Sequence, residues 1–162
     1  MTAPASGLNH LRGDGTAHMI DVSAKEVTTR SASARGRVMM SAVAIDALRG
    51  GTVPKGDALG VARLAGIQAA KRTPDLVPLA HPVAVHAVEV DLLVEDESVA
   101  ITATVRTADR TGVEMEALTC VSVAALALVD MIKAVDKLST ISDIQVVAKS
   151  GGRSGDWVRE DA

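Results

Sequence analysis

The segment GVEMEALTCVSVAALALVDMIKAVDK, residues 112–137, is almost entirely apolar in its middle and charged only at its ends. Glu114 and Glu116 lie near its start, and Asp130 and Lys133 near its end. Apolar residues around the whole circumference predict a helix that is buried on several sides. The longest uninterrupted apolar run, Val123 to Val129, is far shorter than the roughly 18 residues that a membrane span requires. The segment therefore predicts the central helix of a packed domain, with no membrane partner.

The residues available to pack around this helix are small. The chain has 162 residues and 48% are hydrophobic, but it has no Phe or Tyr and only one Trp, Trp157. This length suits a single domain. Because Ala, Val and Leu fill less space than aromatic rings, helices in this chain must approach one another closely, and burial between subunits is expected to add to the core.

The formal net charge of −3 argues against sequence-independent binding of nucleic acid, which needs a basic stripe. The first ten residues do not pair a basic region with an apolar stretch, so no signal peptide is predicted. Cys120 is the only cysteine, which excludes a disulfide within the chain, and we interpret it as a small buried hydrophobe. A cytoplasmic protein is expected.

The remaining sequence alternates strands and helices. Strands are predicted at 29–40, 84–94, 99–107 and 141–152, and helices at 41–51 and from Asp57 to about Arg72. The two middle strands, joined by a short polar turn, form an antiparallel hairpin. The order predicts an α+β fold, an antiparallel sheet with helices packed on one face. Residues 1–12 are expected to form a flexible arm, 13–150 a single catalytic domain and 151–162 a Gly-rich tail.

The charged ends of the central helix allow two interpretations. Thr111 and Glu114 have the spacing of a capping box, and Asp130 and Lys133 that of a routine surface ion pair. On a buried helix, however, such charges must be paired or must line a polar cavity. Glu116 and Asp130 are fourteen residues apart, or roughly 21 Å along one helix, so one small substrate could hardly touch both. We therefore hypothesise an active site between subunits.

In this hypothesis, two copies of the helix pack antiparallel about a twofold axis. The N-terminal end of each helix then lies against the C-terminal end of the helix in the partner. Small residues such as Ala124, Ala125 and Ala127 would allow the close contact.

Other residues are candidates for ligand binding. His81 lies between Pro78 and Pro82, which exclude a helix and favour a fixed, extended segment. Lys55 directly precedes a helix N-terminus, where a phosphate would also meet free backbone N–H groups. The Gly-rich stretch KSGGRSGD at 149–156 either binds phosphate or forms a flexible C-terminus. Each of these residues is also compatible with an ordinary loop position, and the histidine spacings predict no zinc site.

Long motifs in this chain resemble one known family. AHMIDVSAKEVT, VPKGDALGVARLAGIQAAKRTPDLVPLAHP, TGVEMEALT, DMIKAVDK and AKSGGRSGD follow one another in the order found in cyclic pyranopterin monophosphate synthases, the MoaC-type enzymes of molybdenum cofactor biosynthesis. The similarity runs from Leu8 to Asp156. It implies a ferredoxin-like α+β domain and a hexamer, a trimer of dimers with active sites at the dimer interface. The implied reaction converts 3′,8-cyclo-7,8-dihydro-GTP to cyclic pyranopterin monophosphate and pyrophosphate.

The resemblance also assigns roles to individual residues. It implies catalytic roles for Asp130, Lys133 and Lys55, and substrate binding by Leu79, Ala80, His81, Glu114, Met115, Glu116 and Lys149. Relatives carry Cys where this chain has Ala80, so that thiol cannot be essential here. The carboxylate and the two amines suit proton transfer near neutral pH. No resident cofactor or metal is implied, and any Mg²⁺ would be held mainly by the substrate triphosphate.

Two other classes of protein remain as alternatives. A nucleotide-sensing module on a ferredoxin-like sheet would bind ligand without turnover and would tolerate Asp130→Asn. An RNA-binding domain on such a sheet is disfavoured by the acidic charge and by the lack of aromatic residues on the strands. The combination of Asp130, Lys133, Lys55 and His81 favours the enzyme, because function resides in the site and not in the fold.

Overall fold

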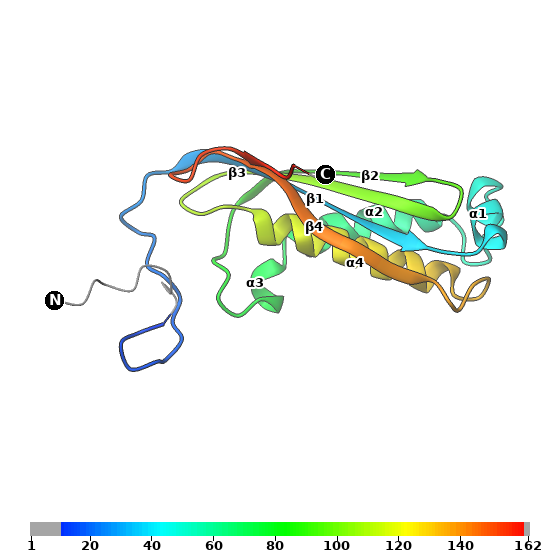
Figure 1. Cartoon of the computed structure of the whole chain (residues 1–162), viewed down its shortest axis with the longest axis horizontal. Coiled ribbons are helices and arrows are strands. Elements are labelled where there is room, and N and C mark those ends of the chain that lie inside the picture. Colours follow the sequence, from blue (N-terminus) through cyan, green and yellow to red (C-terminus); the bar gives the residue numbers. More distant parts are fainter. Residues whose placement is uncertain (1–10, 161–162) are drawn as a thin grey trace.

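A computed structural model describes residues 11–160 as one antiparallel sheet with helices on one face (Figure 1). The strands are β1 (Thr28–Met39), β2 (Val85–Val94), β3 (Ser98–Asp109), β4 (Thr140–Ser150) and β5 (Trp157–Val158), in the sheet order β2-β3-β1-β4-β5. The helices are α1 (Ala42–Arg49), α2 (Ala58–Ala70), α3 (Thr73–Leu76) and α4 (Glu114–Ile132). Without α1, α3 and β5 the order is β-α-β-β-α-β, the ferredoxin-like arrangement, which confirms the predicted fold class.

The strand residues alternate between the helices and solvent, as their sequences predict. On β1, the side chains of Ala32, Ala34 and Val38 are fully buried, and Arg37 on the opposite face is exposed. The hairpin also forms as predicted, with Val94 of β2 opposite Val99 of β3. One face of the sheet therefore belongs to the core, and the other carries polar side chains such as Ser33 and Thr104, whose hydroxyls are 2.8 Å apart.

Small residues let α4 lie close to its neighbours. A Cβ atom built on Gly66 of α2 would lie 2.9 Å from the carbonyl oxygen of Cys120 and 3.1 Å from the Cβ of Ala124. A Cβ on Gly36 of β1 would lie 2.8 Å from a side-chain carbon of Val121. The close packing expected from the composition is confirmed, because α4 approaches both α2 and the sheet at glycines.

Cys120 lies within this packed region and is fully buried. Burial raises the pKa of its thiol to about 12, because the charged thiolate would be poorly solvated there. The interpretation of Cys120 as a buried hydrophobe is confirmed.

α4 by itself is long and apolar enough to cross a membrane, but half of that stretch is buried within the fold. It packs on the sheet and against α2, as the core helix of a domain does (Figure 1). Ala124 and Ala125 are fully buried in the chain's own core, so their proposed part in a contact between subunits was wrong. The exposed face of α4 instead carries Met115, Leu126 and Asp130.

The ends of α4 also differ from the expectation. The residue before the helix is Val113, and no side chain caps it, so the predicted capping box of Thr111 and Glu114 was wrong. The Glu114 carboxylate is instead 3.5 Å from Lys149 Nζ, an opposite charge that local sequence does not reveal. At the other end the helix stops at Ile132, and Asp136 and Lys137 follow in a turn.

The terminal segments are described in part. Residues 1–10 of the predicted arm and the last two residues of the predicted tail, 161–162, lie outside the described residues. Residues 151–156 form a loop after β4, and β5 then pairs with β4 through Lys149 opposite Trp157. This loop returns the chain beside the start of β1, where Gly151 lies against the backbone of Thr29.

Candidate active site

Two segments that are distant in sequence form one cavity at the N-terminal end of α4. The segment at 77–84, which begins with a turn closed by the hydrogen bond from Ala80 N to Val77 O, contributes Leu79, Ala80 and His81. The first turn of α4 contributes Glu114, Met115 and Glu116. The cavity has a volume of about 380 Å³ and is also lined by Ile20, Val22, Lys25, Val83, Thr111 and Gly112. All six residues that the resemblance assigns to substrate binding in these two segments are thus brought together.

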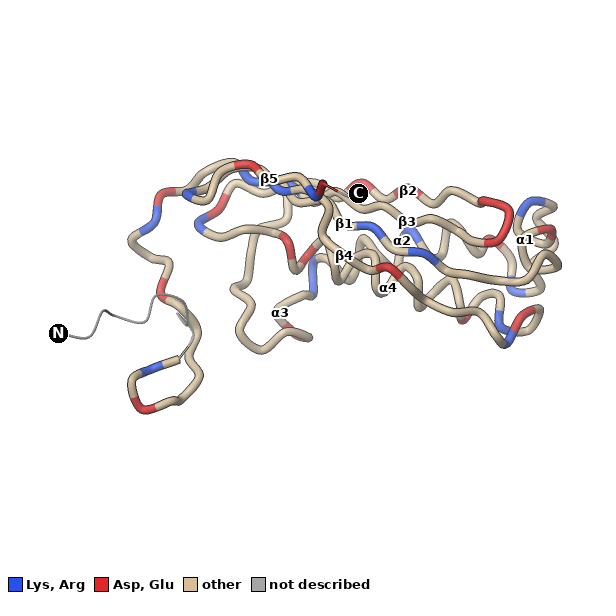
Figure 2. The backbone as a smooth tube through the Cα atoms, in the orientation of Figure 1, with Lys and Arg blue, Asp and Glu red and all other residues tan. Residues whose placement is uncertain are grey.

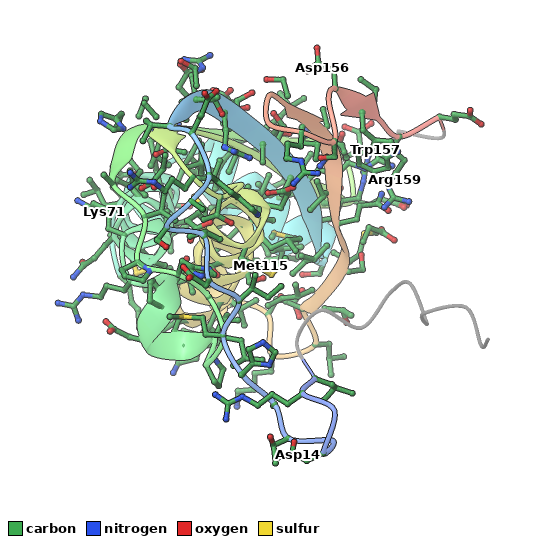
Figure 3. All side chains as sticks on the ribbon, turned by 90° about the vertical axis from the view of Figure 1, so that its left-hand side faces the viewer. Asp14, Lys71, Met115, Asp156, Trp157 and Arg159 are labelled. Carbon is green, nitrogen blue, oxygen red and sulfur yellow. The ribbon has the colours of Figure 1, made fainter. Side chains whose placement is uncertain are left out.

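The N-terminal segment from about residue 19 to 27 runs across this cavity. The His81 Nε2 atom is 2.6 Å from the carbonyl oxygen of Ile20. Because a carbonyl can only accept a hydrogen bond, Nε2 carries the proton and donates it. Arg110 Nε donates to the carbonyl of Lys25 at 3.0 Å and so ties the far end of the segment. Figure 3 views this end of the molecule, with Met115 at the near end of α4 beside the segment.

Glu116 is the most deeply buried carboxylate of the cavity, with 3% of its surface exposed. Burial raises its pKa above the ordinary value, and the neighbouring charge of Glu114 raises the pKa further. Glu116 is therefore easier to protonate than a surface glutamate. It can donate a proton to a bound ligand or accept one from it.

Cationic side chains surround a second cavity that adjoins the first. This cavity, about 120 Å³, shares Lys25, Thr111, Gly112 and Glu114 with the first and adds Arg30, Ser31, Lys149, Ser150, Gly151 and Ser154. A further cavity next to it contains Lys25, Arg30 and Arg153. Figure 2 shows the basic positions of β1 and of the loop after β4 near this end of the sheet. This arrangement suits a multiply charged anion.

Glycine is required in the loop that completes the cationic cavity. Gly151 and Gly152 have φ values of 84° and 74°, which L side chains rarely adopt. A Cβ on Gly152 would also lie 2.2 Å from the Arg30 guanidinium. The requirement for glycine is strictest at Gly151, where a Cβ would lie 2.3 Å from the backbone oxygen of Thr29.

Lys25 and Arg30 were missed as site residues. Lys25 belongs to the first motif of the resemblance, but no local feature distinguishes it from a solvated surface lysine. Its importance is apparent only in the fold, because it lines all three of these cavities.

Asp130, Lys55 and Lys133 form a separate cluster at the C-terminal end of α4. Lys55 Nζ is 2.8 Å from Asp130 Oδ2, and Lys133 Nζ is 2.8 Å from Oδ1. The hydrogen bond from Lys133, followed by that from Lys55, lowers the pKa of Asp130 to about 2. At neutral pH Asp130 is therefore an ionised carboxylate that accepts hydrogen bonds from both amines. All three side chains remain about half exposed.

The cluster lies far from the cavity within one chain. Glu116 and Asp130 occupy the two ends of the same continuous helix, which places them roughly 21 Å apart along its axis. Figure 1 shows the start of α4 above α3 and its end toward α1, and Figure 2 shows separate charged positions near the two ends. The structure thus brings the predicted residues together as two groups, not one.

The described residues contain no group of three or more His, Cys, Asp or Glu side chains placed to hold a metal ion. The second cavity contains one carboxylate, that of Glu114, and its charged neighbours Lys25, Arg30 and Lys149 would repel a metal cation.

Comparison with known proteins gives a consistent result. Residues 19–152 match the model of the MoaC family. A cyclic pyranopterin monophosphate synthase of Streptomyces coelicolor is 60% identical over 156 residues, which cover 96% of this chain and 92% of the relative. The enzyme of that name from Streptomyces griseus is 64% identical over 152 residues, 94% of this chain and 86% of the relative. In Corynebacterium glutamicum the identity is 53% over 152 residues, 94% of this chain and 97% of the relative.

Proposed function

Because the chain belongs to the MoaC family, we propose that it converts 3′,8-cyclo-7,8-dihydro-GTP to cyclic pyranopterin monophosphate, with release of pyrophosphate, in molybdenum cofactor biosynthesis. One observation in the structure carries the proposal. Two motifs that are more than thirty residues apart, at 79–81 and 114–116, line one cavity that adjoins a cationic cavity. Such a pair of cavities suits a substrate with a fused ring at one end and a triphosphate at the other.

The larger cavity would hold the ring system. Its volume of about 380 Å³ lies within the range of small-molecule sites, roughly 300–1,000 Å³. The apolar side chains of Ile20, Leu79 and Met115 can pack on a flat ring. The carboxyl groups of Glu114 and Glu116 can accept hydrogen bonds from N–H groups on the edge of the ring. The raised pKa of Glu116 also lets this residue exchange a proton with the ring.

The cationic cavity would hold the phosphates. Lys25, Arg30 and Lys149 line it, and Arg153 lines the neighbouring cavity that also contains Lys25 and Arg30. Closing the cyclic phosphate requires attack of a sugar hydroxyl on the α-phosphorus, and the bond to the departing pyrophosphate breaks. Fixed cations stabilise the negative charge that develops on the leaving group. Mg²⁺, if present, would be bound mainly by the triphosphate itself.

Asp130, Lys133 and Lys55 would supply the proton transfers that open one ring and close another. With its pKa near 2, Asp130 remains a carboxylate that holds the two amines in place, and Lys55 and Lys133 are the groups of this cluster that would exchange protons with the substrate. Since these residues lie at the far end of α4, a second copy of the chain must provide them to the cavity.

We propose a dimer in which the exposed face of α4 lies against its partner in the antiparallel direction. Met115, Leu126 and Asp130 belong to this face, and Leu126 is 60% exposed in the single chain, which supports burial there. Three such dimers would form the hexamer of the family. The enzyme would act in the cytoplasm and bind neither nucleic acid nor membrane, in keeping with its net charge of −3.

A complementation experiment tests the enzyme and the shared site together. Purified wild-type protein is incubated with 3′,8-cyclo-7,8-dihydro-GTP, and the pterin product is followed by mass and fluorescence. Asp130→Asn and Glu116→Gln are each expected to be nearly inactive, and unfolding and reassembling a mixture of the two should restore activity. One site in each mixed dimer would then contain both native groups.

Two results would contradict the proposal in different ways. If well-folded wild type binds the substrate without turnover, the nucleotide-sensing alternative is favoured. If the wild type is active but the mixture recovers nothing, each chain contains its own complete site, and the shared site is wrong.

A further inference from the structure

Asp136 is, with Glu116, one of two charged side chains that are buried among residues 11–160, with 9% of its surface exposed. It lies in the turn that follows α4. A buried carboxylate is stable only if hydrogen bonds replace the water it loses. Backbone N–H groups, that of Ser41 first and that of Leu138 second, supply these bonds and lower the pKa of Asp136. It therefore stays charged at neutral pH.

The carboxylate of Asp136 links two distant parts of the chain. Its Oδ2 accepts a hydrogen bond from the backbone N–H of Ser41 at 2.7 Å, and its Oδ1 accepts one from Leu138 at 2.8 Å. Ser41 is the N-cap residue directly before α1, and its own side chain does not cap the helix. In a capping box, a glutamate in the first turn accepts a hydrogen bond from the backbone N–H of the N-cap residue. Asp136 makes the same contact with the N-cap residue of α1, although it is 95 residues away in sequence.

The two segments that Asp136 links also contain Asp130 and Lys55, which form an ion pair. Asp136 follows Asp130 and Lys133 by six and three residues, and α1 leads through Gly50 and Gly51 to the loop that contains Lys55. α1 has only eight residues, too few to be stable alone. Its place depends on its buried side chains and on polar contacts at its ends, Asp136 at the start and Arg49 with Asp96 at the finish.

We propose that Asp136 is a positioning residue for the cluster of Asp130, Lys55 and Lys133. It fixes the start of α1 against the turn after α4, and it thereby holds the Lys55 amine at the Asp130 carboxylate without touching substrate. The inference rests on the catalytic role proposed above for this cluster.

Two substitutions weaken the contact between Asp136 and Ser41 from opposite sides. Asp136→Asn leaves one accepting oxygen in place of two, so the side chain can keep only one of its bonds to Ser41 and Leu138. Ser41→Pro removes the donor and should leave the backbone in place, because Ser41 has φ −68°, close to the value of proline. Each should lower kcat on the order of tenfold to 100-fold, since a small misplacement of catalytic groups has effects of this size. KM should remain nearly unchanged, and the double variant should be no worse than either single one.

Glu95→Gln is the matched control. The Glu95 carboxylate also accepts hydrogen bonds, from Ser98 and Arg37, but at the turn between β2 and β3. Its replacement should leave kcat unchanged, because Arg49 at the end of α1 bonds to the Glu95 backbone carbonyl and not to the side chain. A second readout needs no substrate: NMR of isotope-labelled lysine side chains, with the Lys55 signal assigned through Lys55→Arg. That signal should move in Asp136→Asn and in Ser41→Pro, and should stay in place in Glu95→Gln.

The outcomes separate the two proposals. An unchanged kcat in folded Asp136→Asn overturns the positioning role, as does a loss of activity that only follows the folded fraction while the Lys55 signal stays in place. If the wild type itself is inactive, the proposed function is wrong, and the lysine spectra still decide whether Asp136 positions Lys55.

Discussion

Lys55 and Asp130 are 75 residues apart in sequence, and their side chains meet at 2.8 Å. The Lys55 amine also donates to the backbone carbonyl of Asp130 at 2.9 Å, which fixes its direction. Lys133 approaches the other carboxylate oxygen, so the carboxylate is shared by two amines. This shared carboxylate is the basis of the first prediction.

Asp130→Asn should lower kcat by about 10² to 10⁴, the range typical of lost acid–base groups. The amide keeps the shape of the side chain but loses the charge that orients both lysines. Steady-state kinetics give the change, and circular dichroism should show an unaltered fold because the site is about half exposed. Residual activity within a factor of about two of wild type would contradict an acid–base role.

Because its pKa is raised in the folded protein, Glu116 should make the protein less stable as pH rises. Its folded-state pKa lies above the ordinary 4.5, so the folded protein binds the proton more tightly than the unfolded chain does. The side chain therefore destabilises the fold increasingly as pH rises above 4.5 and through the folded pKa. Glu116→Gln, which cannot ionise, should melt higher than wild type at neutral pH.

Melting curves of Glu116→Gln and wild type across pH 4–8 provide the measurement, at one protein concentration because assembly also affects Tm. The difference between the two should shrink toward acid pH. A constant difference at every pH would mean that the charge of Glu116 is not responsible.

Gly66→Ala should lower the free energy of unfolding by about 1–3 kcal/mol, as overpacking of a tight core does. The new methyl group would lie 2.9 Å from a backbone oxygen of α4, which cannot easily move away. Urea denaturation measures the loss. Gln68→Ala, at an exposed position of the same helix, should stay within about 0.5 kcal/mol of wild type. Equal stability of the two variants would contradict the close approach of α2 and α4.

Lys25→Ala should weaken binding of inorganic pyrophosphate by about tenfold to 100-fold, because a charge-assisted hydrogen bond contributes roughly 1.5–3 kcal/mol. Competitive inhibition of turnover by pyrophosphate gives the constant. Arg106→Ala removes an equal charge from the open face of the sheet, where Arg106 pairs with Glu89, and should leave the constant unchanged. If both variants weaken inhibition equally, only the net charge matters.

Cys120 should resist alkylation in the folded protein. Its thiol is fully buried and its pKa is near 12, so almost no thiolate exists at pH 8. Mass spectrometry after treatment with iodoacetamide should find no adduct, and one adduct after denaturation. Rapid modification of the native protein would show that the contact between α2 and α4 opens.

Much of the fold followed from local patterns. Alternation at Val88, Val90 and Leu92 predicted one strand of the hairpin, and Asp57 predicted the start of α2, where its carboxylate accepts the N–H of Gly60 at 2.8 Å. These predictions succeeded because each rests on contacts within a few residues. The capping box at Thr111 does not form, because the helix begins directly after Val113, and the Glu114 carboxylate lies beside the distant Lys149.

Patterns along the chain were enough to predict the sheet, the buried central helix and, through long motifs, the family. The packed fold was needed to show which side of α4 is free, that Lys25 lines three cavities, and that Asp136 reaches the start of α1. The physical reason is the range of the interactions. Periodicity and capping act between neighbours in the chain, but a cavity or an ion pair depends on which distant segments the packed core brings together.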